Sequence, residues 1–193
     1  MNIIDKLLFI FFLSNFCMEK VILTVGYARS GKSTVAHYLE EKCGYKRIGF
    51  SDFIANELAK RNLEITKNNM VSYGEQFRNE LGKDYLIKQV LKEAEGNDKV
   101  VISGTRLMRE YDAIKEKFSN AKMILVSSQE KQRFERRKDQ SKTFEEFVAR
   151  DKEDEKAYGM CEVFAKNDYE IENSGSLEDL LKKVDEIIEK ESE

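Results

Sequence analysis

The stretch "VILTVGYARSGKSTVAHYL", residues 21–39, decides the fold of this chain. Residues 21–25 form a short apolar, β-branched run, and such a run predicts a buried strand. Helical sequence begins at Thr34, so the eight residues "GYARSGKS" between them must turn tightly. The stretch therefore predicts a β-α unit with a glycine-rich turn at its centre.

The turn, residues 26–33, matches the phosphate-loop pattern G-x-x-x-x-G-K-[ST] in the strand-to-helix setting that this pattern requires. Backbone N–H groups of such a turn surround a phosphate at a helix N-terminus, where the helix dipole favours anions. Lys32 adds a cation toward the β- and γ-phosphates, and the Ser33 hydroxyl is a ligand for Mg²⁺. We predict ATP and Mg²⁺ as cofactors. The predicted binding residues of the turn are Gly26, Ala28, Arg29, Ser30, Gly31, Lys32, Ser33 and Thr34.

Short apolar strands alternate with helical segments along the rest of the chain. Further strands are predicted at residues 45–50, 99–105, 122–128 and 168–175. This alternation requires parallel strands joined by crossover helices. The predicted fold is therefore a three-layer α/β/α domain of the P-loop type with a parallel sheet.

Helix starts are predicted from capping residues. Ser51 or Asp52 is expected to cap the helix after the second strand. The highly charged segment 127–159 contains no strand pattern and predicts two helices joined by a short polar loop. Their predicted capping pairs are Ser127 with Glu130 and Thr143 with Glu146.

Composition excludes several classes of protein. A chain of 193 residues with 41% hydrophobic residues fits one domain, and a net charge of −3 argues against nucleic-acid binding. The three cysteines are far apart and there is one histidine, so neither a zinc site nor a disulfide framework is predicted. Small-molecule chemistry at the phosphate loop is the expected activity.

The N-terminus contains an apolar run at residues 7–13, shorter than the roughly 20 residues that span a bilayer. It lacks the small-x-small cleavage pattern of a signal peptide. Met18 lies three residues before the first strand, so we expect residues 1–17 to be an extension and residues 18–193 to be the working, cytoplasmic domain, without stable membrane insertion. Membrane tethering through residues 7–13 is the alternative.

The segment "GYARSGKSTVAHYLEEKCGYKRIGFSD", residues 26–52, resembles the start of nucleoside monophosphate kinases, especially deoxynucleoside monophosphate kinases and dephospho-CoA kinases. From residue 21 onward the layout also resembles an archaeal family of adenylate-kinase-related P-loop proteins. The resemblance implies a kinase domain with a helical lid at about residues 129–158. It also implies transfer of the γ-phosphoryl group of ATP to a small nucleotide-like acceptor such as AMP, and leaves the oligomeric state open.

The resemblance implies an acceptor site after the second and third strands. In these kinases arginines on the helices after the second strand hold the acceptor phosphate, and Arg78 and Lys83 lie there; a solvated charged face is the alternative. Arg106, in "VISGTRLMRE", matches the arginine that clamps this phosphate. It follows a parallel strand at the edge where open α/β sheets bind ligands.

Ser103 departs from the family pattern. In the family an acidic residue at this position helps to order Mg²⁺ through water, and a serine cannot supply that charge. Either Asp52 supplies a carboxylate near the transferred phosphoryl group, as a similar aspartate is thought to do in dephospho-CoA kinases, or catalysis is slow. Asp52 as a helix cap alone is the alternative.

The resemblance also implies lid and adenine contacts. Arg133, Arg136 and Arg137 share one helix face, and Arg150 follows on the next helix. At least one of Arg133, Arg137 and Arg150 is expected to close over the triphosphate, although charged runs are usually solvated. The loop "ENSGSLEDL", residues 172–180, resembles the adenine-contacting loop and implies backbone contacts near Asn173 and Gly175.

The sequence therefore predicts an ATP-dependent nucleotide kinase whose catalytic residues are Lys32, Asp52, Arg106 and Arg137. The enzymatic alternative is a dephospho-CoA kinase, with a hydroxyl acceptor and Asp52 as its base. The alternative from another class is a nucleotide-driven switch or assembly ATPase. Ser103 mildly favours the switch, and the acceptor-side and lid arginines oppose it.

Overall fold

A computed structural model describes residues 20–136 and 143–192. A five-stranded sheet with the strand order β2-β3-β1-β4-β5 forms its centre, and all four strand pairings are parallel. The strands are β1 (Lys20–Val25), β2 (Lys46–Gly49), β3 (Lys99–Ser103), β4 (Lys122–Ser127) and β5 (Tyr169–Glu172). The predicted parallel α/β/α fold is confirmed.

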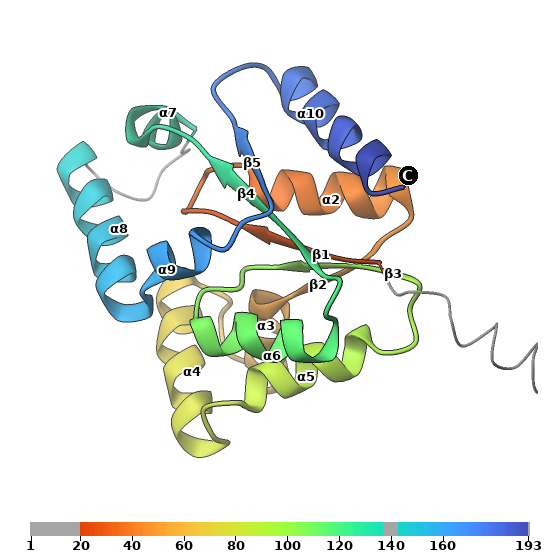
Figure 1. Cartoon of the computed structure of the whole chain (residues 1–193). Coiled ribbons are helices and arrows are strands. Elements are labelled where there is room, and N and C mark those ends of the chain that lie inside the picture. Colours follow the sequence, from red (N-terminus) through yellow and green to blue (C-terminus); the bar gives the residue numbers. More distant parts are fainter. Residues whose placement is uncertain (1–19, 137–142, 193) are drawn as a thin grey trace, which may run out of the picture.

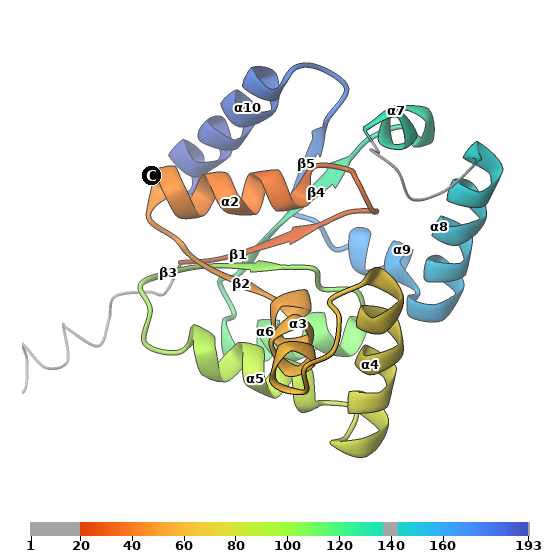
Figure 2. The same ribbon diagram turned by 180° about the vertical axis from the view of Figure 1, so that it is seen from behind.

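Helices cover both faces of the sheet (Figures 1 and 2). Helices α2 and α10 lie on one face, and α3, α5 and α6 lie on the other. Helices α7, α8 and α9 lie beyond the carboxyl ends of the strands (Figure 1). The helices are α2 (Lys32–Cys43), α3 (Phe50–Lys60), α4 (Lys67–Glu80), α5 (Tyr85–Ala94), α6 (Met108–Lys117), α7 (Glu130–Glu135), α8 (Phe144–Tyr158), α9 (Met160–Phe164) and α10 (Leu177–Lys190).

The sheet separates two apolar cores, because successive side chains of a strand point to opposite faces. Leu23 and Ile102 pair in register and pack toward α5 and α6. Ile22 and Val101 pair beside them and pack toward α2 and α10. All residues of β1 after Lys20 are buried, as expected for a central parallel strand. This packing fixes the start of the phosphate loop.

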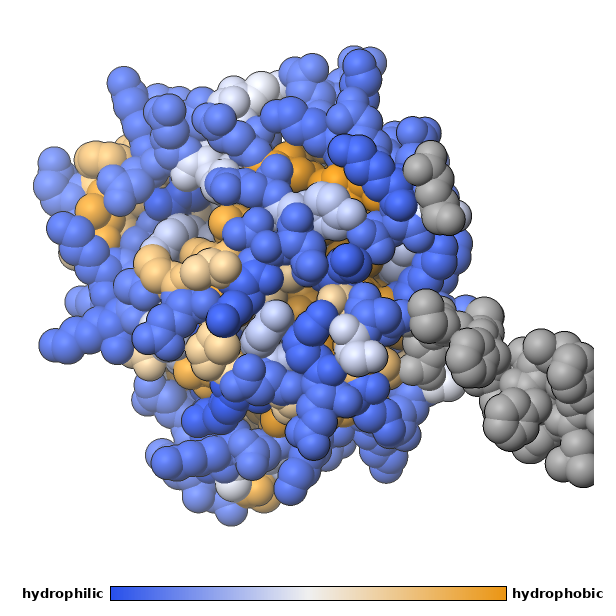
Figure 3. All heavy atoms as spheres, in the orientation of Figure 1, coloured by the Kyte–Doolittle hydropathy of each residue, from blue (hydrophilic) through white to orange (hydrophobic). Residues whose placement is uncertain are grey.

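The surface is mostly hydrophilic in the view of Figure 3, with its apolar side chains in separate small patches. Across residues 20–136 and 143–192, none of the helices has the length and apolar character needed to cross a bilayer. The predicted extension, residues 1–17, lies outside the described residues.

Two of the predicted helix caps are wrong and one is confirmed. Thr143 and Glu146 form the predicted capping box at α8. Ser127 does not cap α7, because β4 continues through it and the helix begins only at Glu130. Helix α3 begins at Phe50, so Ser51 and Asp52 lie in its first turn, after the N-cap residue Gly49.

The short helix α9 was not predicted. Gly159 adopts a φ of 62° and ends α8, and its left-handed conformation turns the chain directly into α9. Met160 and Val163 of α9 are buried in the same core as α6. The turn at Gly159 therefore ties the far end of α8 to the sheet.

Candidate functional site

Two glycines give the phosphate loop its shape between β1 and α2. Gly26 has a φ of 143°, and a Cβ atom there would collide with the backbone oxygen of Val126. Gly31 has a φ of 110°, and a Cβ atom there would lie 2.5 Å from the Asn173 side-chain nitrogen. Both positions need a residue without a side chain. The loop is therefore packed tightly against β4 and the segment after β5.

The N-terminus of α2, like that of α5, has neither a side-chain cap nor an acidic residue in its first turn. The N-cap residue of α2 is Gly31. By contrast, α8 and α10 begin with the capping residues Thr143 and Ser176. The first N–H groups of a helix have no intrahelical partner. At α2 they form a positively polarised end that suits an anion.

Carbonyl oxygens of the phosphate loop accept hydrogen bonds from Lys32 within the loop and from Arg133 and Asn173 outside it. Lys32 Nζ donates to the Tyr27 oxygen at 3.2 Å, and Arg133 Nη1 donates to the Ala28 oxygen at 3.1 Å. Asn173 Nδ2 donates to the Ser30 oxygen at 2.7 Å. Engaged carbonyl groups are less repulsive to an anion than exposed ones, and these bonds fix the loop's conformation.

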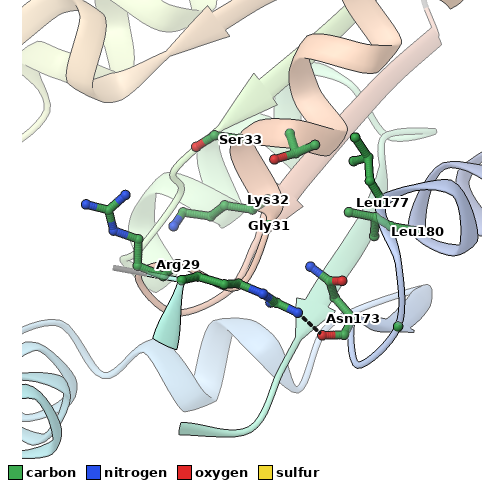
Figure 4. A pocket seen from close by; sticks show the side chains of 10 residues that line it. Arg29, Gly31, Lys32, Ser33, Asn173, Leu177 and Leu180 are labelled. Carbon is green, nitrogen blue, oxygen red and sulfur yellow. Dashed lines mark hydrogen bonds between the residues drawn. The ribbon is translucent and has the colours of Figure 1, made fainter. Parts of the chain in front are cut away.

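A first cavity of about 370 Å³ lies where the phosphate loop meets the β5–α10 segment. Figure 4 shows Asn173, Leu177 and Leu180 opposite Gly31, Lys32 and Ser33 of the loop. Arg136 donates to the backbone oxygen of Asn173 at 2.7 Å, drawn as a dashed line. The lining residues are Arg29, Gly31, Lys32, Ser33, Thr34, Arg136, Asn173, Gly175, Leu177 and Leu180.

A second cavity of about 380 Å³ lies on the other side of the loop, between α3, α4, the end of β3 and α8. Lys32 and Ser33 line both cavities. The apolar lining of the second cavity consists of Ala28, Phe50, Ile54, Met70, Val71, Tyr158 and Met160. Its charged lining, apart from Lys32, consists of Arg78, Arg106, Glu110, Arg150 and Asp154. The structure thus brings the predicted Arg78, Arg106 and Arg150 together, and leaves Lys83 on the surface outside this lining.

The charged groups of the second cavity fall into two sets. Glu110 is buried, and it accepts hydrogen bonds from the backbone N–H groups of Arg106 and Leu107 while its other oxygen lies 3.5 Å from Arg78. Arg106, Arg150 and Asp154 have side chains that form no hydrogen bond or ion pair with another described residue. The Arg106 guanidinium lies 5.3 Å from the centre of the Tyr158 ring. Three charged groups therefore face the cavity without a polar partner among the described residues.

Asp52 is not placed with these residues. Its carboxylate lies 2.7 Å from Arg47 Nη1, and it is not among the described residues that line either cavity. The reason is helical geometry: Phe50, Ser51 and Ile54 face the cavity, and the second residue after Phe50 lies about 200° around the helix from it. The structure does not support the expected role of Asp52 beside the transferred group.

Arg133 is also placed differently from the expectation. It is 2% exposed, its Nη1 lies 2.6 Å from Asp151, and its guanidinium lies 5.2 Å from the ring centres of both Tyr27 and Phe147. Burial raises the pKa of the Asp151 carboxyl, and the Arg133 guanidinium opposes that rise. Arg133 therefore fastens α7 and α8 to the phosphate loop instead of reaching into either cavity. Arg137 lies outside the described residues.

Tyr27, the second residue of the phosphate loop, is fixed from the α8–α9 side. Its hydroxyl donates to Glu155 at 3.2 Å and lies 3.3 Å from the sulfur of Cys161, and its ring packs edge-on against Phe164. Burial is the main cause that raises the pKa of the Tyr27 hydroxyl, and Cys161 and Glu155 add to it. The hydroxyl therefore stays protonated and neutral at ordinary pH.

Sequence reasoning missed several residues of the two cavities, including Glu110 and most of the apolar lining. Arg136 was recognised on a helix face but not assigned to the site, and Asp154 and Tyr158 were not recognised at all. The missed signal is the spacing i, i+4, i+8 of Arg150, Asp154 and Tyr158, which puts them on one face of α8. Among the described residues, His, Cys, Asp and Glu form no group of three that could hold a metal ion.

Comparison with known proteins gives consistent matches in sequence. The family described as "AAA domain" matches residues 25–156. A UPF0200 protein of Thermococcus kodakarensis is 32% identical over 185 residues, covering 88% of this chain and 99% of that protein. A UPF0200/UPF0201 protein of Archaeoglobus fulgidus is 33% identical over 182 residues, covering 88% of this chain and 55% of that protein.

Solved structures share the fold at low sequence identity. A shikimate kinase from Acinetobacter baumannii in complex with shikimate has a TM-score of 0.58 at 19% identity, covering 92% of this chain and 97% of that one. A gluconokinase from Sinorhizobium meliloti has a TM-score of 0.54 at 14% identity, covering 86% and 90%. The fold is thus that of P-loop kinases. None of these proteins is named as an adenylate kinase, so that finer resemblance stays a prediction.

Proposed function

The chain belongs to the AAA domain family and to the UPF0200 proteins, and on this premise we propose that it transfers the γ-phosphoryl group of ATP to a small nucleotide-like acceptor, with AMP as the proposed substrate. The observation that carries the proposal is the pair of cavities that meet at Lys32 and Ser33. A transferase needs a donor and an acceptor on opposite sides of the group that moves.

The first cavity is proposed as the ATP site. The triphosphate would lie on the phosphate loop at the N-terminus of α2, with Lys32 beside the β- and γ-phosphates. Leu177 and Leu180 offer an apolar wall for the adenine ring next to Asn173 and Gly175. Leu177 is 60% exposed, as expected for a surface that a ligand would cover.

Magnesium fits the residues that are present. Mg²⁺ typically takes one or two protein ligands together with phosphate oxygens and water, so a site with few carboxylates suits it. Ser33 would hold the ion through its hydroxyl, and bound Mg²⁺ would neutralise phosphate charge. Ser103 lines the second cavity but supplies no carboxylate there.

The second cavity is proposed as the acceptor site. Arg106 would pair with the acceptor phosphate, joined by Arg78, whose charge Glu110 already offsets in part. Arg150 reaches the same cavity from α8 and would add charge near the transferred group. Phosphoryl transfer needs little covalent help from the protein, so positioning and charge neutralisation would carry the catalysis.

The dephospho-CoA kinase alternative required Asp52 as the base for a hydroxyl acceptor. The Arg47–Asp52 ion pair and the absence of Asp52 from the described lining of the second cavity count against that role. A switch or assembly ATPase is distinguished from a kinase by experiment, because such a protein would hydrolyse ATP without any acceptor.

The test is transfer of radiolabel from [γ-³²P]ATP to a panel of acceptors: AMP, other nucleoside monophosphates and dephospho-CoA. We expect label in a nucleoside diphosphate, most strongly with AMP, and at least about 100-fold slower labelling with the Lys32→Ala variant. If label appears only as inorganic phosphate, at the same rate with and without every acceptor, the protein is an ATPase and the proposed kinase activity is wrong.

A further inference from the structure

Helix α8 presents two different faces. Phe147 and Asp151 are buried on one face, where Asp151 pairs with Arg133 of α7. Arg150, Asp154 and Tyr158, spaced four residues apart, line the second cavity. One face of α8 therefore fastens the helix to the fold, and the other contributes functional groups to the cavity.

The carboxylate of Asp154 does not fit a cavity that serves a phosphate alone. It forms no hydrogen bond or ion pair with a described residue, and it shares the cavity with Glu110, a second carboxylate. A carboxylate near a bound phosphate raises the free energy of the complex by like-charge repulsion. Glu110 avoids this cost through Arg78 and two backbone N–H groups, whereas Asp154 has no such partners within residues 20–136 and 143–192.

An unpartnered carboxylate in a half-closed cavity is suited to a hydrogen-bond donor on the ligand. A bond from a hydroxyl or amino group to a carboxylate is charge-assisted and stronger than a neutral one. The charged side chains of the cavity are of two kinds. Arg106 and Arg150 are cations that suit an anionic group of the ligand, and Asp154 suits a hydrogen-bond donor. The cavity thus has complementary groups for two different parts of one molecule.

We propose that Asp154 accepts a hydrogen bond from a hydroxyl or amino group of the acceptor, and so selects phosphate monoesters that carry such a donor over simple phosphate anions. The inference rests on the proposed function, because it takes the second cavity as the acceptor site. It assigns Asp154 as a residue that determines specificity, and no proton or phosphoryl group is transferred to it.

Calorimetric titration with AMP, of wild type and of Asp154→Ala, is the first measurement. Glu153→Ala is the matched control, since Glu153 is the preceding carboxylate on α8 and is exposed. Loss of a charge-assisted hydrogen bond is expected to weaken AMP binding at least about tenfold in Asp154→Ala. Glu153→Ala should bind AMP within about twofold of wild type. If the alanine variant does not fold, Asp154→Asn takes its place; its amide oxygen still accepts a hydrogen bond but without the charge, so a measurable but smaller loss of AMP affinity is expected.

The donor group on the ligand is identified by removing it. Binding of 2′,3′-dideoxy-AMP tests the ribose hydroxyls, and binding of purine riboside 5′-monophosphate tests the adenine amino group. One of these analogues should bind wild type more weakly than AMP does, and should bind Asp154→Ala and wild type equally well. Methyl phosphate is an anion without such a donor. It should bind Asp154→Ala at least as tightly as it binds wild type, because the substitution removes a repulsive charge.

The inference is overturned if AMP binds Asp154→Ala as tightly as wild type, or if both analogues lose the same factor of affinity as AMP does on that substitution. It is also overturned if methyl phosphate loses as much affinity as AMP. Failure of the proposed function looks different: wild type itself would then bind neither AMP nor any other monophosphate.

Discussion

The two cavities on either side of Lys32 differ in how their polar groups are used by the fold. Around the first cavity, Arg136 and Asn173 are bonded to backbone oxygens of the chain, and nearby Arg133 is buried in an ion pair. Around the second cavity, Arg106 and Arg150 form no hydrogen bond or ion pair through their side chains with described residues. The fold thus uses Arg136 and Asn173 for its own hydrogen bonds, whereas Arg106 and Arg150 are left for a ligand. Arg78 at the second cavity is the exception, because it pairs with Glu110.

This difference has a thermodynamic consequence. Substitutions near the first cavity remove interactions that stabilise the folded chain, so they should lower the free energy of unfolding. Substitutions of Arg106 and Arg150 at the second cavity should change ligand binding and leave the free energy of unfolding nearly unchanged, because side chains without a polar partner among the described residues contribute little to stability. Each prediction below tests one side of this difference.

The largest expected effect is at Arg133. Arg133→Met leaves Asp151 buried without its partner, which should lower the free energy of unfolding by about 3–5 kcal/mol. Urea denaturation measures this change. The double variant Arg133→Met/Asp151→Leu removes both charges and should recover most of the loss. A loss below about 1 kcal/mol in the single variant would contradict the structural role given to Arg133.

Lys32→Ala should lower phosphoryl transfer by about 10²–10³-fold or more, because the cation beside the transferred group is lost. Steady-state assays of ADP formation measure the effect, and circular dichroism checks that the variant is folded. Near-normal turnover would contradict the phosphate-loop assignment. Lys131→Ala, at an exposed lysine of α7, is a control that removes the same charge.

Two arginines, one at each cavity, are expected to differ in how much they contribute to folding stability. Arg136→Ala removes bonds to the Asn173 oxygen and the Ser128 hydroxyl, and should cost about 1.5–3 kcal/mol of folding stability. Arg150→Ala should change stability by less than about 0.5 kcal/mol. Thermal unfolding without ligand compares the two variants. Equal losses of stability would mean that the two cavities do not differ as described.

The sequence was sufficient to predict the sheet, the phosphate loop and the two helices of the charged segment. These features depend on local patterns: the apolar run before Gly26, the loop spacing, and the Thr143–Glu146 capping box. Gly26 and Gly31 are needed because a side chain there would collide with Val126 or Asn173. The glycines of the motif therefore indicate that the loop is closely packed.

The charged residues were harder to assign, because sequence spacing does not reveal which partner a long side chain finds. Arg133 and Arg150 were equivalent in sequence, yet one is buried against Asp151 and the other lines the second cavity. Asp52 was expected at the site, but Arg47, five residues earlier, binds it. Asp154 was overlooked because a carboxylate within a charged helix resembles an ordinary solvated residue.

The central claim is that donor and acceptor occupy separate cavities, and Arg106→Ala tests it most directly. Calorimetry is performed on this variant and on wild type with AMP and, separately, with a non-hydrolysable ATP analogue. We predict that the variant loses about 2 kcal/mol or more of AMP binding, while its affinity for the ATP analogue is unchanged. Equal AMP binding by variant and wild type, or a matching loss for the ATP analogue, would contradict the claim.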